Sequence, residues 1–288
     1  MAPMTNVESQ DGTLPLHYCQ KNESYHCAKL LLQYGAHVNR QTEDEEFTPL
    51  HVAAQHGLLE HADLYLRYGA AVDKRSINGE TPLSVACSHP QEPQDLERYY
   101  QVCQHLIQHG ANIHTRDKDQ QSPLHLACKS ANPQVVELLL EKGAEVNVMS
   151  YSGNTAMQNI LQVTSYKLQN QPELIVRALL NHGAIRVWPG ALIKVLRYCY
   201  TSPRTVEVLL NTYSKLQGTE ETGLRWYQRK NNRNISGSPV GLLAVPQSTF
   251  SSASLPLCSA LTPGGADATG SAQAAFTTLT PAVPTASL

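Results

Sequence analysis

The sequence is poor in aromatic and charged residues and contains no long apolar run. Aromatic residues make up 6% of the 288 positions, charged residues make up 16%, and the net charge is −2 at pH 7. A nearly neutral chain lacks the basic surface that attracts nucleic acids or anionic lipids. No apolar stretch approaches the roughly 20 residues that span a bilayer. We therefore expect no nucleic-acid partner and no membrane partner.

The usual signals of catalysis, metal binding and secretion are missing as well. The seven cysteines are scattered and none forms a Cys-x-x-Cys pair, so we expect reduced thiols and a location in the cytoplasm or also in the nucleus. There is no His-Glu-x-x-His motif, no Gly-rich phosphate loop and no Gly-x-Ser-x-Gly elbow. The segment from Met1 to Leu14 is polar, unlike a signal peptide. We predict a protein with no catalytic residue, no metal ligand and no cofactor.

What the sequence does contain is one repeated block that ends in Gly-Ala. The glycines of these steps are Gly35, Gly69, Gly110, Gly143 and Gly183. Successive glycines are 34, 41, 33 and 40 residues apart, which indicates a period near 33 with two lengthened copies. Four copies also open on a Pro-Leu pair. A period of this size is typical of stacked repeats, in which each unit buries its apolar face only against its neighbours.

Each repeat carries the start and stop signals of a helix pair. In the clearest copy, Thr48 suits a helix N-cap and Pro49 suits the first helical position. The second helix has an apolar stripe, and the glycine after it suits the left-handed conformation. A 33-residue unit with Thr-Pro-Leu-His is the ankyrin signature. We therefore predict an all-α ankyrin-repeat solenoid built of helix-turn-helix units with hairpin fingers.

The repeats divide the chain into an N-terminal lead at 1–10, an array at 11–213 and a tail at 214–288. Five repeats are clear, at about 11–39, 47–73, 79–114, 121–147 and 153–184, and a degenerate sixth lies at 188–213. The third is lengthened around residues 88–93, which contain Pro90 and Pro93, and we expect a protruding loop there between its two helices. A similar insertion at 162–171 lengthens the fifth.

The tail differs in composition from the array. From residue 235 to the end the only charged side chain is Asp267, among Ser, Thr, Ala, Pro and Gly, and such a segment is expected to be disordered. The basic residues between Arg225 and Arg233 are interpreted as a solvated linker rather than a nuclear-import or nucleic-acid patch. Without a covering domain, part of the apolar stripe from Val206 to Leu210 is expected to be exposed, which would make the sixth unit the least stable.

The insertions, together with the segments at 178–191 and 201–211, resemble the ankyrin repeat and SOCS box family. The resemblance implies a substrate receptor of a cullin-5 ubiquitin ligase, in which the array holds the target and a C-terminal SOCS box binds elongin B, elongin C and cullin-5. The nearest counterpart of the box is the sequence from Ser254 to Cys258, where Pro256 would break the elongin-binding helix. We expect the box to be missing or replaced, as in an isoform made by an alternative exon or intron read-through.

Two functions of different classes follow. The array is either the target-recognition part of such a ligase receptor, or a stand-alone binder or decoy that holds targets without recruiting the ligase. An enzyme is the least favoured class: Cys103, Cys128 and Cys199 are the candidate nucleophiles, but each stands at a helix position that ankyrin arrays fill with small buried residues. The histidines of the Pro-Leu-His steps are expected to bond to neighbouring backbone or hydroxyl groups.

The partner is expected on the concave side of the array, where fingers and first helices are free of the stacking constraint. Arg and Tyr are the residue types that often dominate binding energy. The first finger precedes the acidic run at 43–46 and the second and third are basic, which favours a partner of alternating charge. The candidate contact residues are Arg40, Gln41, Glu43, Lys74, Arg75, Ile77, Arg116, Asp117, Lys118, Met149 and Tyr151.

Overall fold

The computed structural model describes residue 6 and residues 13–212, and every regular element in this part of the chain is helical. The α-helices are α1 (Tyr25–Gln33), α2 (Pro49–Gln55), α3 (Leu59–Arg67), α4 (Pro82–Ser88), α5 (Leu96–Gln108), α6 (Pro123–Ser130), α7 (Pro133–Glu141), α8 (Ala156–Val163), α9 (Pro172–Asn181), α10 (Leu192–Cys199) and α11 (Pro203–Leu210). Short 3-10 turns are η2 (Pro15–Tyr18), η3 (Asn22–Ser24), η4 (Leu168–Asn170) and η5 (Pro189–Ala191).

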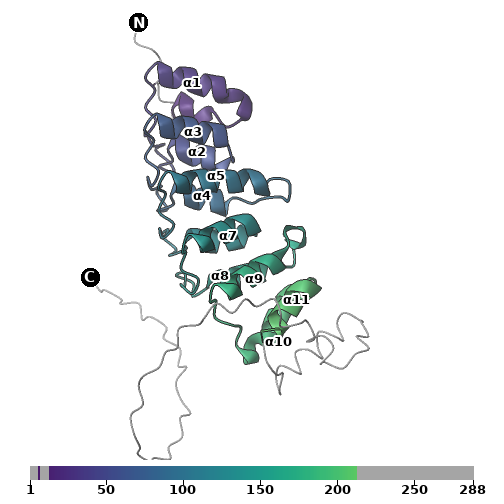
Figure 1. The fold of residues 1–288 in the computed structure, drawn as a ribbon. Coiled ribbons are helices and arrows are strands. Elements are labelled where there is room, and N and C mark those ends of the chain that lie inside the picture. Colours follow the sequence, from purple (N-terminus) through teal and green to yellow (C-terminus); the bar gives the residue numbers. More distant parts are fainter. Residues whose placement is uncertain (1–5, 7–12, 213–288) are drawn as a thin grey trace, which may run out of the picture. The chain divides into compact units, whose positions relative to one another are not determined.

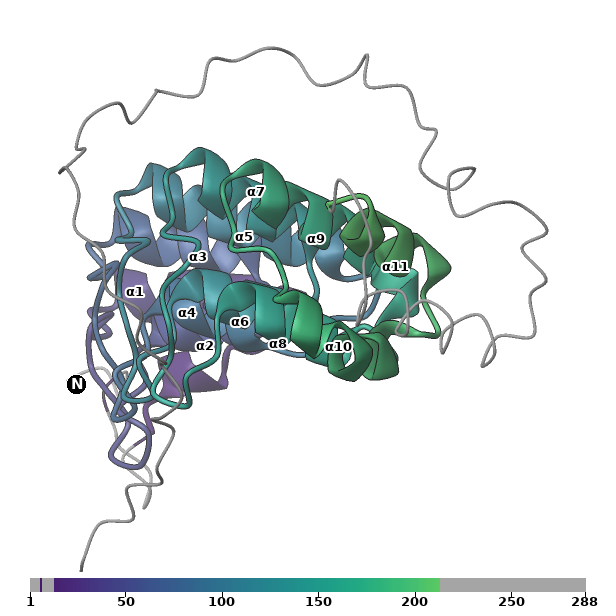
Figure 2. The same ribbon diagram turned by 90° about the horizontal axis from the view of Figure 1, so that it is seen from below.

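The helices form two stacked layers. Helices α2, α4, α6, α8 and α10 pack on one another in chain order, and α1, α3, α5, α7, α9 and α11 form the second layer (Figures 1 and 2). Each helix of the first layer also packs on the helix that follows it, so that one continuous apolar core runs through the units. The predicted all-α ankyrin solenoid is confirmed for these residues. The predicted tail and the region of the expected SOCS box lie outside them.

Local sequence explains where the helices begin and end. Proline occupies the start of α2, α4, α6, α7, α9 and α11, where its missing N–H leaves no broken helical bond. The Thr48 hydroxyl accepts a bond from the backbone N–H of His51, which caps α2. The five Gly-Ala glycines have φ between +82° and +88°, for example Gly143 at +88°. The glycine at each second-helix end therefore takes the left-handed conformation that the sequence predicts.

Three units carry a Pro-Leu-His step, and its histidine ties each of these units to the next one. The His51 ring is fully buried, with Nδ1 2.8 Å from the Thr48 hydroxyl and Nε2 3.2 Å from the Glu80 carbonyl oxygen. His125 bonds in the same way to Ser122 and to the carbonyl oxygen of Val148. Burial lowers the pKa of His51 to about 4, so the ring is neutral at pH 7. The prediction that these histidines bond to backbone and hydroxyl groups is confirmed.

The first unit differs from the others in its first helix. The Pro-Leu-His step of this unit forms the four-residue 3-10 turn η2 instead of an α-helix. The His17 ring nevertheless keeps the position of its counterparts, with Nε2 3.0 Å from the Phe47 carbonyl oxygen. The turn is followed by η3 and α1, which packs on α3. The bond to the next unit is thus retained although the helix is shortened.

The last described unit is better covered than its sequence indicates. Val206 and Leu209 are 1% and 2% exposed, and Leu210 is also buried. The expectation that part of this stripe is exposed is wrong for these three residues, because α11 packs on α9 and on α10 at the same time. Val208 is the remaining apolar residue of the stripe and is partly buried against the core. A helix with two neighbours can bury a wider stripe than a helix with one.

Candidate protein-binding surface

The hairpin fingers all project from the same edge of the helix stack (Figure 1). They connect α1 to α2, α3 to α4, α5 to α6, α7 to α8 and α9 to α10. At the base of the fingers, side-chain amides bridge neighbouring units: Asn39 Nδ2 donates to the Gly69 carbonyl, and Asn39 Oδ1 accepts from the Ala71 N–H. Asn147 makes the same pair of bonds with Gly183 and Ile185. These bonds fix the fingers relative to one another.

Further along, the fingers are joined tip to tip. The Ile77 N–H donates to the Glu45 carbonyl at 2.9 Å, the Lys118 N–H to the Asn78 carbonyl at 2.9 Å, and the Tyr151 N–H to the Asp119 carbonyl at 2.7 Å. We call this series of bonds the finger ladder. It gives the first four fingers one continuous backbone surface, and a partner would meet that surface without first having to order separate loops.

Three of the eleven candidate residues have structural roles within the fingers. The Gln41 amide donates to the Glu46 and Arg75 carbonyls. The Arg116 guanidinium lies 3.6 Å from the Glu145 carboxylate. The Asp117 carboxylate accepts from the Gln121 N–H at 2.7 Å, and burial raises its pKa. Each of the three is only half-exposed.

The other eight candidates are exposed, at Arg40, Glu43, Lys74, Arg75, Ile77, Lys118, Met149 and Tyr151. Arg75 also has an internal bond, because its guanidinium donates to the Arg116 carbonyl at 3.0 Å. The Tyr151 side chain is 85% exposed and that of Met149 is 59% exposed, while the backbone of Tyr151 is fixed by the finger ladder. Exposed apolar side chains on a fixed backbone are well suited to protein contact. Their assignment as contact residues stays a prediction.

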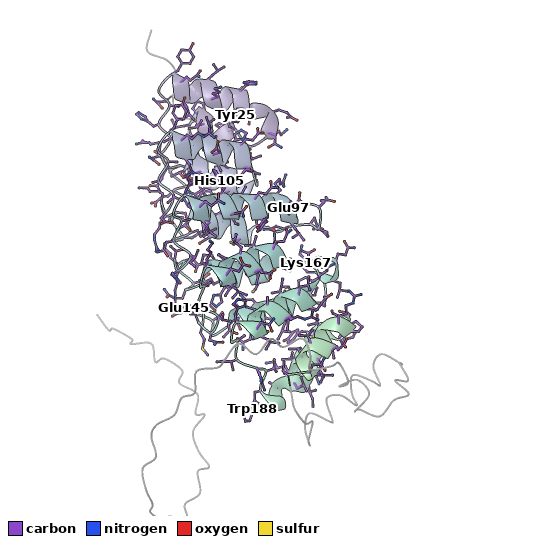
Figure 3. The ribbon with its side chains drawn as sticks, viewed as in Figure 1. Tyr25, Glu97, His105, Glu145, Lys167 and Trp188 are labelled. Atoms are coloured by element: carbon purple, nitrogen blue, oxygen red, sulfur yellow. The ribbon has the colours of Figure 1, made fainter. Side chains whose placement is uncertain are left out.

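Two further residues extend the apolar side of this surface. Ile185 and Trp188 belong to the finger between α9 and α10 and are 67% and 76% exposed. Figure 3 shows Trp188 projecting at the end of the array. We call Ile77, Met149, Tyr151, Ile185 and Trp188 the fingertip set. Ile185 and Trp188 are not among the candidates expected from the sequence, because no finger is expected after the fifth repeat, although Trp is rare in this chain and favoured in binding hot spots.

The thiols considered as nucleophiles are poorly placed for that chemistry. Cys103, Cys128 and Cys199 are each 0% exposed, and burial raises the pKa of Cys199 to about 12 and that of Cys128 still further. A thiol held in its neutral form inside the core is neither reactive nor accessible. Within residues 13–212, no three His, Cys, Asp or Glu side chains come close enough to share a metal ion. None of the helices described above has the length and apolar character to span a membrane.

Comparisons with known proteins agree with the repeat architecture. A family model for ankyrin repeats matches residues 2–76, 50–150 and 94–187. Human ankyrin repeat and SOCS box protein 10 is 50% identical over 221 residues, which are 75% of this chain and 47% of that protein. The human proteins 18 and 16 of the same name are 45% and 40% identical over 208 residues, 72% of this chain and 45% of each relative.

The chain belongs to the ankyrin-repeat family, and the resemblance to ankyrin repeat and SOCS box proteins is confirmed. Within that group, the insertions together with the segments at 178–191 and 201–211 suggest protein 16, whereas protein 10 has the higher identity of the two. The chain spans about half the length of these relatives.

Proposed function

We propose that the chain binds a protein target through its fingers and acts as the target-recognition part of a cullin-5/elongin BC ubiquitin ligase receptor of the SOCS-box type. The ligase assignment is implied by the resemblance to ankyrin repeat and SOCS box proteins. Elongin B, elongin C and cullin-5 are the partners that it implies, in addition to the target. The array itself has no catalytic part in this proposal and supplies only the recognition surface.

The observation that carries the proposal is the fingertip set on the bonded fingers. Its five exposed apolar side chains stand on fingers that are tied to their neighbours by the finger ladder and by Asn147. The desolvation of large apolar and aromatic side chains provides much of the binding energy in protein complexes. The charged candidates around this set, such as Lys74 and Lys118, would set orientation and association rate more than affinity.

Proximity labelling in cells tests the recognition role. The variant Tyr151→Ala/Trp188→Ala removes the two largest side chains of the fingertip set, and Tyr166→Ala is the matched control, because Tyr166 is 71% exposed but lies in the insertion after α8. We expect the labelled set of the fingertip variant to lose proteins that wild type and control share. Identical labelled sets from all three would refute recognition through the fingers.

A pull-down with purified elongins B and C separates the ligase receptor from the second candidate, a stand-alone binder or decoy. The second candidate rests on the sequence around Pro256, which departs from the elongin-binding pattern. Direct binding of the elongins by the full chain supports the ligase role and refutes the decoy. Target capture without elongin binding supports the decoy.

A further inference from the structure

The edge opposite the fingers carries a groove that the proposed function does not use. In Figure 3, Glu97 and Lys167 lie at this edge, away from Glu145 on the finger side. The groove crosses the N-terminal parts of α5 and α7, follows α9 to its last residue and encloses about 520 Å³. That volume is within the range of ligand-binding sites.

The groove exists because the two insertions flank a unit that has none. Seven residues separate α4 from α5 and eight separate α8 from α9, but only Ala131 and Asn132 separate α6 from α7. The start of α7 is therefore recessed between two longer connections. The groove combines Pro93 from the first connection, Leu96 from the start of α5, Pro133 from α7, and Asn170 and Gln171 from the second connection.

The two insertions are joined by side-chain bonds behind this groove. Lys167 Nζ donates to the Gln91 carbonyl at 2.8 Å and lies 3.7 Å from the Glu92 carboxylate. Asn132 Nδ2 donates to Gln91 Oε1 and to the Leu96 carbonyl. Gln91 is fully buried, so the expected protruding loop is instead folded against the next unit at this residue. These bonds hold the two insertions in place on either side of the groove. The groove is therefore preformed in the absence of a ligand.

Polar groups along the groove suit a polypeptide backbone. The exposed side-chain amides of Gln169, Gln171 and Asn181 make no hydrogen bond with another described residue. An amide offers a donor and an acceptor, which match the alternating N–H and C=O groups of an extended chain. Asn170 also lines the groove, is 2% exposed and has no hydrogen-bond partner for Nδ2. A backbone carbonyl is an acceptor of the kind that this nitrogen lacks.

The charges of the groove have opposite signs at its two ends. Glu97 on α5 accepts bonds from the Gln101 and Gln134 amides, which hold its carboxylate in place. Glu137 on α7 and Arg177 on α9 are exposed, and neither has an ion-pair partner among the described residues. The α5–α7 end therefore attracts a cation and the α9 end attracts an anion. Leu174, three residues before Arg177 on α9, adds an apolar contact to the groove and is 41% exposed.

We propose that this groove binds an extended peptide segment of a partner protein that carries a basic and an acidic residue on either side of an apolar residue. Packed helices lie about 8–10 Å apart, so the path from α5 to α9 takes about five or six residues of extended chain. A protein bound here occupies the edge opposite the fingers. The array can then hold this partner and a finger-bound target at once.

Three blocked synthetic peptides test the proposal by fluorescence anisotropy with the full chain. The bipolar peptide contains Lys-Ser-Leu-Ser-Glu, and its two companions contain Lys-Ser-Leu-Ser-Lys and Glu-Ser-Leu-Ser-Glu. We expect the bipolar peptide to bind roughly fivefold more tightly than either companion, the size of effect that an exposed ion pair gives. Equal affinities for the three peptides, or no binding to wild type at millimolar peptide, would overturn the proposal.

Charge reversal then identifies the site. Arg177→Glu makes the groove acidic throughout and should shift the preference to the doubly basic peptide, whereas Glu137→Arg should shift it towards the doubly acidic one. The controls Arg197→Glu and Glu141→Arg make the same changes at exposed positions of α10 and α7 outside the groove. Unchanged preferences in the groove variants, or equal changes in the controls, would refute this location. Circular dichroism verifies that each variant is folded.

Discussion

Acid should weaken the array through its buried histidines, and His51 allows the effect to be calculated. Burial lowers the pKa of its ring from 6.5 to about 4 in the folded chain. The unfolded chain therefore binds a proton at this site at pH values where the folded chain does not. The contribution of the neutral, buried ring to the free energy of unfolding is therefore fully present above pH 6.5. It is lost progressively as the pH falls towards 4.

The magnitude follows from the two pKa values. The difference between 6.5 and about 4 corresponds to roughly 3 kcal/mol in total. Of this, about 2 kcal/mol is lost between pH 7.5 and pH 5. Burial also lowers the pKa of His17 and of His125, so these two rings should also reduce the free energy of unfolding as the pH falls.

Urea unfolding of the wild type and of His51→Gln at both pH values measures the contribution. The variant loses the bonds to Thr48 and Glu80, so it should be less stable at pH 7.5. Between pH 7.5 and pH 5, the free energy of unfolding of the variant should also fall by about 2 kcal/mol less than that of the wild type, because the titrating ring is gone. His37→Gln, at an exposed finger position, serves as the control and should keep the wild-type loss. An equal loss in wild type and His51→Gln would refute the reasoning.

Three further predictions concern single residues of the fold. Asn132→Ala removes the cap of α7, the bond to Gln91 in the first insertion and the bond to Leu96 at the start of α5, and should lower the free energy of unfolding by about 2–3 kcal/mol. A loss below about 0.5 kcal/mol in urea titration would contradict the role of this amide. Gly143→Ala should lower the free energy of unfolding by about 1–2 kcal/mol. The cause is backbone strain at φ +88° alone, because an added Cβ meets no atom within 4 Å. Unchanged stability would argue against the left-handed cap. Mass spectrometry after brief iodoacetamide treatment should find the exposed Cys27 alkylated well before the buried Cys128, and the reverse order would contradict the described burial.

The sequence predicts the helix pairs well because their signals are local. Proline at the first position of a helix and glycine after its end act within a single turn, so the steps at Pro49 and Gly69 indicate their elements without knowledge of the neighbours. The bond between His51 and the next unit is also predictable, since histidine recurs at the same place in the first, second and fourth repeats.

The groove could not be predicted in this way. Lys167 and Gln91 are 76 residues apart in the chain, and nothing in either local sequence indicates that the insertions meet. The same limit applies to α11, where Val206 and Leu209 are buried by two helices at once. A periodicity argument assigns one face to a helix, and the number of its neighbours is a property of the stack.

The central claim is that the fingers recognise a protein target. Hydrogen exchange of the full chain, alone and with a target captured by proximity labelling, tests it most directly. We expect added protection in the fingers that carry Tyr151 and Trp188, with α5, α7 and α9 unchanged at the opposite edge. Added protection confined to the outer helices, with the fingers unaffected, would contradict it.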